Sequence, residues 1–341
     1  MKTELLVGII TVALFIIYFI ARRRRRKQNK RPVKPGTVVL HQFLPSPLSL
    51  SGSPPCLKLE TFLRMAKIPY ESRYGLKFSK KGKIPWIELN GEEIADSNFC
   101  IRFLRNEFKV DIDCSHLSDE AKGLAHSIQT MLEENTYCVS QCSGRLSFFH
   151  YYRFSFVMLP SLLSVAAELL IEKHFKGGGG AEGGGGGRVA VELPAPRDRA
   201  LFYYRFFSPD YAMYTRMQLF GSFSWPLRYV IFYFIQRRCR GDVWSQGIGR
   251  HSEQDVYGIA KRDLLAASAV LGEKKFLFGD KPCLADAVLF AFIACATWNC
   301  PQSPFAELTK TKATNLERHA QQMKDLYYPD WDEITEKLKS D

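Results

Sequence analysis

The chain has 341 residues, of which 46% are hydrophobic and 24% are charged, a globular balance that excludes global disorder and a membrane protein with many spans. Its formal net charge is +12, but nine of the basic residues lie between positions 22 and 34, where there is no acid. The remainder holds 38 basic against 35 acidic residues. Because a nucleic-acid protein spreads its basic groups over a binding face, nucleic acid is not expected as a partner.

The first 36 residues predict a membrane anchor followed by a basic linker. Leu5–Ala21 contains no charged residue, and as a helix it would be about 25 Å long, at the short end of a bilayer span. The run Arg22–Arg26 follows with no small-residue cleavage site before it, unlike a cleaved signal peptide. The positive-inside rule then places the linker, residues 22–36, and the body in the cytosol. We expect one anchor over residues 1–21, in the mitochondrial outer membrane or the endoplasmic reticulum.

Residues 37–110 predict an α/β domain with the order strand, helix, strand, hairpin, helix. Asn90 and Gly91 are the strongest short hairpin signal in the chain, and Asp96 with Ser97 can cap the helix that follows. In chain order we expect a strand at Thr37–Phe43, a helix from Cys56 that ends by Pro69, a strand at Tyr70–Tyr74, a basic loop at Lys77–Lys83, a strand at Ile84–Leu89, a return strand at Glu92–Ala95 and the capped helix.

Residues 115–335 predict an all-helical domain, because strand signals fade after Cys114. Helices are expected over Ser118–Tyr137, after the capping-box residues Ser252–Asp255, and over the apolar run Ala285–Trp298. Gly272 stands where a helix C-terminal glycine would.

A predicted insertion interrupts this domain near residues 155–203. Gly177–Gly187 holds nine glycines, and without a following Gly-Lys-Ser/Thr it is flexible linker rather than a phosphate-binding loop. Tyr-Tyr-Arg-Phe occurs twice, at 151 and 203, which also suggests an insertion. Phe154–Ile171 is apolar enough to raise a second membrane span, but its proline, serines and Glu168 favour an ordinary helix or disorder.

The N-terminal pattern resembles the thioredoxin-like domain of the glutathione transferase superfamily. The resembling features are the strand Thr37–Phe43, the helix after Pro55, the block Lys83–Ile87 and the hairpin with its cap, Asn90–Ser97. The resemblance implies a thioredoxin-like N-terminal domain followed by an all-helical transferase-like C-terminal domain. It also implies that Pro85 is cis and shapes a glutathione site, and that Asp96 and Ser97 hold the γ-glutamyl end of glutathione.

A closer resemblance, from about residue 37 to 332 without the insert, is to the failed axon connections family, relatives of the metaxins. It rests on Cys56–Ala66, Gly82–Glu88, Gly247–Glu253 and Tyr328–Trp331. The resemblance implies an N-terminal anchor, an association with axon development and, through the metaxins, a link to mitochondrial protein import.

Ser53 and Cys56 are the candidate catalytic residues, since both fall near the start of the first helix, where the helix dipole favours a thiolate. Ser53 can stabilise a glutathione thiolate or serve as a turn or cap residue. Cys56 can be reactive or a buried small apolar residue. Ser53 replaces the first cysteine of a Cys-x-x-Cys spacing, so a dithiol–disulfide cycle is not available there. Asp96 and Ser97 can bind glutathione or only cap their helix.

No metal site is expected, because Cys138 and Cys142 lie one helical turn apart but no histidine pair is spaced to complete it. Asp286, in the box Cys283–Asp286, is interpreted as structural, and His41 as a packed histidine.

Two hypotheses about the function remain. The favoured one is an anchored interaction or scaffold protein with unidentified protein partners, a homodimer being one option and no cofactor being required. The other is a glutathione-dependent transferase or thiol-handling stress-response enzyme.

Overall fold

The computed structural model describes residues 33–45, 49–112, 117–136, 200–220, 225–245, 247 and 250–340. The predicted anchor over residues 1–21, most of the linker and nearly all of the insertion near 155–203, with Phe154–Ile171 and the glycine run, lie outside the described residues. Among the helices that are described, none combines the length and the apolar character needed to cross a membrane. The fold lies within one compact unit, Val38–Asp341.

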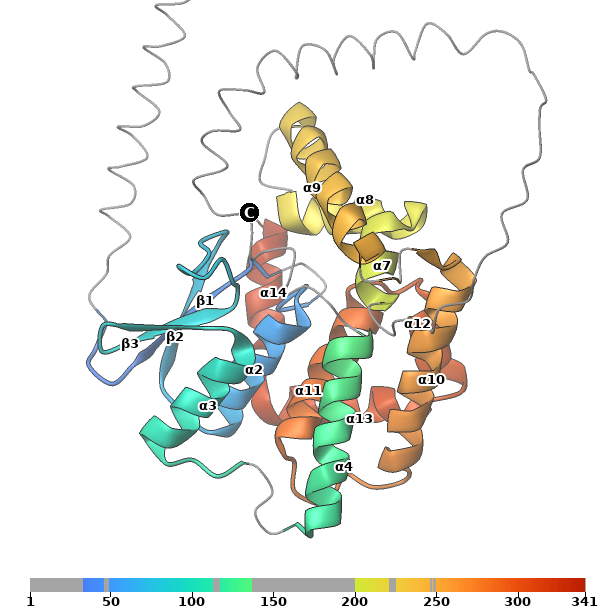
Figure 1. The fold of residues 1–341 in the computed structure, drawn as a ribbon. Coiled ribbons are helices and arrows are strands. Elements are labelled where there is room, and N and C mark those ends of the chain that lie inside the picture. The colour runs from blue at the N-terminus through green and yellow to red at the C-terminus, as the bar shows by residue number, and fades with distance from the viewer. Residues whose placement is uncertain are drawn as a thin grey trace, which may run out of the picture. The chain divides into compact units, whose positions relative to one another are not determined.

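The N-terminal domain is a four-stranded mixed sheet with two helices (Figure 1). Its elements are β1 (Val38–Gln42), α2 (Pro54–Met65), β2 (Tyr70–Tyr74), β3 (Trp86–Leu89), β4 (Glu92–Ala95) and α3 (Ser97–Phe108). The strand order is β2-β1-β3-β4, with β1 parallel to β2 and antiparallel to β3. Element order and hairpin follow the sequence prediction, and the thioredoxin-like assignment is confirmed.

The β3–β4 turn shows why the hairpin could be predicted. Asn90 and Gly91 have φ of 49° and 88°. Two successive positive φ angles are what a two-residue type I′ turn needs, and asparagine and glycine tolerate them best. The turn pairs Leu89 with Glu92, which sets the register of both strands.

Both helices pack on one face of the sheet. Their shared apolar core consists of Val38 and Leu40 of β1, Ile87 and Leu89 of β3, Leu59, Phe62 and Leu63 of α2, Ile68, and Cys100, Ile101 and Leu104 of α3. The strand residues alternate along β1 and β3, as a sheet with one helix-covered face requires. This packing fixes the starts of α2 and α3 beside the sheet.

The C-terminal domain is all-helical, as predicted. Its elements are α4 (Asp119–Thr130), the π-helix η1 (Met131–Thr136), α7 (Ala200–Phe207), α8 (Pro209–Phe220), α9 (Trp225–Ser245), α10 (Glu253–Leu271), α11 (Leu284–Ile293), the π-helix η3 (Ala294–Trp298), α12 (Pro304–Thr311), α13 (Thr314–Tyr327) and α14 (Trp331–Ser340). Helix α11 lies at the centre and packs on α2, α4 and α13. From Ala285 to Ile293 every residue of α11 is buried.

The predicted caps in this domain are observed. Ser252 Oγ accepts a hydrogen bond from the Asp255 amide at 3.2 Å, and Gly272 ends α10 with φ of 54°. Asp286 accepts from the amides of Cys283 and Leu277, both at 2.8 Å, and lies 2.9 Å from His319 Nε2. Its bonds are structural, which agrees with the interpretation from sequence.

Candidate functional site

Three segments that carry the predicted site residues meet at one small apolar cluster. Its buried members are Cys56, Ile84, Trp86 and Ala95. Ile84 directly precedes Pro85, and the peptide bond between them is cis, as the resemblance implied. Ala95 directly precedes Asp96. The fold therefore brings the start of α2, the turn before β3 and the start of α3 together.

Ser53 is the N-cap of α2. Its backbone is extended (φ −119°, ψ 112°), and its carbonyl accepts hydrogen bonds from the amides of Cys56 and Leu57, both at 3.0 Å. Pro54 and Pro55 open the helix, where a missing amide costs nothing. The Ser53 side chain is 3% exposed and makes no capping bond. Apart from the Cys56 thiol, no described protein atom is a hydrogen-bond partner of its hydroxyl.

The helical domain covers the segment that leads into α2, residues 49–53, which we call the α2 entry loop. Ser49 and Ser51 are fully buried. Asn299 Nδ2 donates to the Ser51 carbonyl at 2.9 Å, and Cys295 Sγ donates to the same oxygen at 3.4 Å. The Arg205 guanidinium donates to the carbonyl of Gly52. A hydroxyl beneath this cover has no exposed face to offer an incoming thiol.

Cys56 is fully buried in the first turn of α2. Burial raises the pKa of its thiol to about 12, and the hydrogen bond to Ser53 offsets only part of that rise. Of the two alternatives left open for Cys56, the structure shows the buried small apolar residue, because the loss of water outweighs the helix dipole. At neutral pH Cys56 is a protonated, inaccessible thiol in this structure.

The start of α3 has different surroundings. Asp96 is its N-cap, with φ of 80°, and Asp96 Oδ1 accepts from the Asn98 amide at 3.1 Å. The Asp96 side chain is half-buried, and Lys83 Nζ lies 3.9 Å from its other oxygen. Ser97, the first residue of the helix, is 8% exposed. A non-glycine residue at this φ is strained, a feature that clusters at ligand sites.

A buried lysine, which sequence reasoning missed, supports the start of α3. Lys58 of α2 is 2% exposed, and its Nζ donates to Asn98 Oδ1 at 2.9 Å and to Glu133 of η1. Asn98 Nδ2 donates to the other Glu133 oxygen at 2.9 Å. The triad joins α2, α3 and the helical domain beside Asp96 and Ser97.

A second ionic network joins two motifs that carried the family resemblance. Arg64 of α2 donates to both carboxylate oxygens of Asp330, at 2.6 and 2.9 Å, and its guanidinium lies 4.3 Å from the Tyr328 ring centroid. Thr61 Oγ1 lies 2.7 Å from the Tyr328 hydroxyl. Arg64 also reaches Glu60 at 3.3 Å, on the same helix. Both motifs therefore serve the contact between the two domains.

His41 is a packed histidine, as predicted from its strand. Its ring stacks on Trp86 with centroids 3.7 Å apart, and its Nε2 lies 3.0 Å from Glu88 Oε1. Burial, with the positive charge of Lys77, lowers the pKa of His41 to about 4 against the opposing effect of Glu88. His41 is therefore neutral at pH 7.

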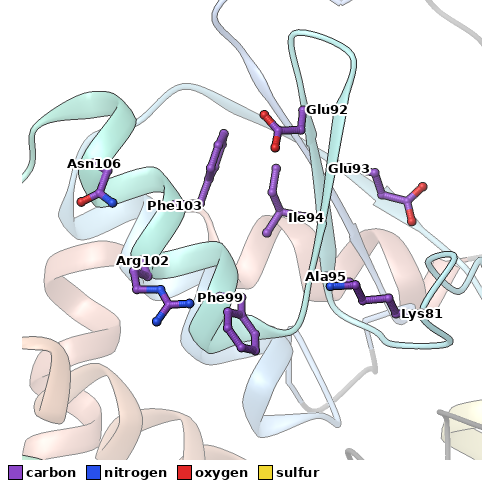
Figure 2. Close-up of a pocket in the computed structure, with 9 residues that line it drawn as sticks. All are labelled: Lys81, Glu92, Glu93, Ile94, Ala95, Phe99, Arg102, Phe103 and Asn106. Atoms are coloured by element: carbon purple, nitrogen blue, oxygen red, sulfur yellow. The ribbon is translucent and has the colours of Figure 1, made fainter.

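An open hollow of about 370 Å³ lies elsewhere, between β4 and α3 (Figure 2). Phe99 and Phe103 of α3 face Ile94 of β4 across it. None of the five predicted site residues lines this hollow. Within the described part of the chain, no three histidine, cysteine or acidic side chains form a group able to hold a metal ion, and Cys138 and Cys142 lie outside it.

Glutathione fits one end of this site and not the other. The start of α3 offers a helix N-terminus and a serine to a carboxylate. The start of α2 offers only a covered hydroxyl and a buried thiol to the sulfur. No chemical step through a glutathione thiolate can therefore be derived from these residues.

Comparisons with known proteins agree with the two-domain assignment. The family model described as the glutathione S-transferase N-terminal domain matches residues 54–143, and the one for the C-terminal domain matches residues 260–323. The Drosophila melanogaster protein failed axon connections is 29% identical over 314 residues. That match covers 88% of this chain, which spans about 60% of the length of the relative.

Solved structures give weaker likenesses. Glutathione transferase GSTFuA2 from Phanerochaete chrysosporium is 10% identical, with 86% of this chain and 99% of that chain covered and a TM-score of 0.49. The Ceriporiopsis subvermispora enzyme CsGST63524, solved in complex with glutathione, is 13% identical, with 85% of this chain and 97% of that chain covered and a TM-score of 0.48.

The resemblance to failed axon connections, predicted from the sequence, is confirmed by the Drosophila relative and the two family models. The chain is therefore a glutathione S-transferase-like homologue of the failed axon connections protein.

Proposed function

We propose that this protein is a membrane-anchored, cytosol-facing interaction or scaffold protein without strong catalysis of its own. The observation that carries the proposal is the cover over the α2 entry loop. The hydroxyl of Ser53 and the thiol of Cys56 are the groups best placed for thiol chemistry, and both are buried. Arg205 and Asn299 of the helical domain hold the entry loop that leads to these two groups.

The membrane part of the proposal rests on the sequence of the first 36 residues. An uncharged stretch at Leu5–Ala21 followed by Arg22–Arg26 has the length and flanks of an anchor with a cytosolic body. The mitochondrial outer membrane and the endoplasmic reticulum are the proposed locations. Fractionation of cells that express the full chain, beside a chain with Ile9, Phe15 and Ile17 replaced by aspartate, tests this part. Equal membrane recovery of the two chains contradicts the anchor.

The name of the Drosophila relative supports a proposed role in axon development. The partners of a scaffold would be proteins, with a second copy of the chain as one option.

The alternative is a glutathione-dependent transferase or thiol-handling enzyme. It is supported by Asp96 and Ser97 at the start of α3. The buried hydroxyl of Ser53 also favours it. Among the described residues only the Cys56 thiol is its hydrogen-bond partner, so a ligand that displaced the cover would find a donor there.

Two measurements separate the scaffold proposal from the enzyme alternative. The full chain in detergent is titrated with glutathione by calorimetry, and it is then assayed with glutathione and a general electrophile. We expect no turnover. Turnover that is lost in Ser53→Ala but kept in Ser127→Ala, an exposed serine of α4, would overturn the scaffold proposal. If glutathione binds, Ser97→Ala should weaken it, and unchanged affinity in that variant contradicts the assignment of Asp96 and Ser97.

A further inference from the structure

Exposed aromatic and arginine side chains form a stripe along α9. Its members are Tyr229, Tyr233, Arg237, Arg240 and Trp244. At 100° per residue all five fall within an arc of about 80°. Trp244 is 56% exposed and Tyr233 is 50% exposed, whereas Phe232 and Cys239 on another face of α9 are buried. The solvent face of this helix is thus as aromatic as its buried face.

Helix α8 lies beside α9 and extends the stripe into a surface (Figure 1). Met213 and Met217 of α8 are 51% and 49% exposed. The Arg228 guanidinium lies 3.2 Å from Met217 Sδ, and the Arg216 guanidinium lies 3.8 Å from the Tyr229 ring centroid. We call these four residues and the α9 stripe together the arginine–aromatic surface.

The charge around this surface is one-sided. Residues 200–250 contain seven arginines and no lysine, against two acids, Asp210 and Asp242. Asp210 belongs to α8 and Asp242 to α9, so the arginines of this region outnumber its acids by five. The excess stands out because the chain outside residues 22–34 is nearly neutral. A partner that complements the surface is therefore anionic.

The aromatic residues narrow the class of partner. Tyrosine, tryptophan and arginine join an apolar body to a polar tip, so they favour the boundary between lipid headgroups and acyl chains. Methionine adds an adaptable apolar contact. The stripe from Tyr229 to Trp244 is about 23 Å long. The sequence of α9 contains four arginines, at positions 228, 237, 238 and 240, which make this helix unsuitable as a membrane span. A helix of this kind lies on a membrane.

We propose that the arginine–aromatic surface docks on an anionic membrane surface. The proposal rests on the proposed function only through the anchor, which would keep the body near a bilayer. Sixteen residues separate Ala21 from Val38, so a fully extended tether would reach at most about 60 Å. Tethering raises the local concentration of lipid, and the surface then orients the body against the headgroups.

Fluorescence quenching by lipid tests the docking. The full chain is reconstituted into vesicles of phosphatidylcholine with brominated acyl chains, alone or mixed with phosphatidylserine, beside Trp244→Phe. The difference in emission between the two chains reports Trp244 alone. We expect Trp244 to be quenched in the anionic vesicles, weakly quenched in the neutral ones, and released at about 1 M salt, where the screening length is about 3 Å.

Charge variants sharpen the test. Each basic residue near an anionic surface contributes roughly fivefold in binding, so Arg237→Gln with Arg240→Gln should shift the contact equilibrium about 25-fold towards the free body. Arg102→Gln with Arg318→Gln removes two exposed arginines elsewhere and should leave the quenching unchanged. Circular dichroism of each variant checks that it is folded.

Three outcomes overturn the proposal. The first is equal quenching of Trp244 in neutral and anionic vesicles. The second is no difference between the wild-type chain and Trp244→Phe in vesicles that have taken up the chain. The third is a response of Trp244 to a single-stranded oligonucleotide and not to phosphatidylserine, which would make nucleic acid the partner. The anchor is tested separately by flotation with neutral vesicles. A chain that does not float with them lacks a working anchor.

Discussion

The starts of α2 and α3 are both helix N-termini of one thioredoxin-like domain, yet their surroundings are opposite. At α2, residues 49–53 are covered by the helical domain, and Ser53 is 3% exposed. At α3, Ser97 is also buried (8% exposed), but Asp96 is half-buried and has Lys83 nearby. Both ends carry the same dipole and the same preference for anions. The difference teaches that access, rather than helix geometry, decides which of two similar ends can take part in chemistry.

The cover comes from residues distant in the chain. Arg205 and Asn299 reach the entry loop from 153 and 248 residues away from their respective partners. The start of α3 is held by Lys58 and Glu133, which support it without covering Asp96. A substitution of Arg205 or Asn299 should therefore loosen the start of α2 and leave the start of α3 unchanged. A substitution of Lys58 or Glu133 should do the reverse.

Lys58→Met should have the largest effect, because it removes the support of the α3 end. Glu133 would lose its ion-pair partner in a half-buried position and Asn98 would lose a donor. Breaking a buried pair from one side typically costs about 3–5 kcal/mol. The measurement is the free energy of unfolding by denaturant, and proteolysis at the start of α3 reports whether that segment has loosened.

Two further variants control for this result. Lys122→Met removes an exposed pair with Asp119 and should cost about 0–1 kcal/mol. The double variant Lys58→Met with Glu133→Leu should recover most of the loss, because no unpaired charge remains. A Lys58→Met chain as stable as Lys122→Met would show that the triad does not hold the α3 end.

Local signals predicted most of the N-terminal domain. Alternating strands, the Asn90–Gly91 turn and the Asp96 cap are properties of neighbouring residues, so the sequence was sufficient to place them. Helices α7, α8 and α9 were not predicted, since aromatic residues occur on both the exposed and the buried faces of α9 and blur its periodicity.

The candidate site was predicted less well, and the reason is again physical. The sequence identified Ser53, Cys56, Pro85, Asp96 and Ser97, and their segments do meet. Cys56 is buried among Ile84, Trp86 and Ala95, and the entry loop before it is held by Arg205, Cys295 and Asn299. Only the tertiary fold brings these residues near. Lys58 could have been suspected, because it is a charged residue between the apolar positions Leu57 and Leu59 of a helix buried on two sides.

Arg205→Ala should open the α2 end, with an intermediate effect. The carbonyl of Gly52 would lose a charge-assisted hydrogen bond in a covered position, which typically costs about 1–3 kcal/mol. The gap should also let reagent reach Cys56. Peptide mapping after alkylation of the native full chain should show faster modification of Cys56 than in the wild-type chain, with the start of α3 unchanged in proteolysis.

Arg237→Ala is the matched control for Arg205→Ala, since Arg237 is an exposed arginine of the same helical region. It should leave both stability and the alkylation of Cys56 at wild-type values. If Arg205→Ala alkylates no faster than Arg237→Ala, the cover over the entry loop does not depend on this contact.

The smallest expected effect is a pH dependence that comes from the covered thiol of Cys56. The thiol of Cys56 has a pKa of about 12 in the folded chain against an ordinary value of 9.0. Between these values the unfolded chain has released a proton that the folded chain keeps, so stability falls as the pH rises above about 9. At about pH 10, one unit above the ordinary value, Cys56 should account for on the order of 1 kcal/mol of the loss. The loss of unfolding free energy between about pH 8 and about pH 10 should therefore be smaller in Cys56→Ala by that amount, whatever the baseline cost of the substitution. An equal loss in both chains would mean that water reaches Cys56 in the folded state, and the contrast between the two helix ends would then disappear.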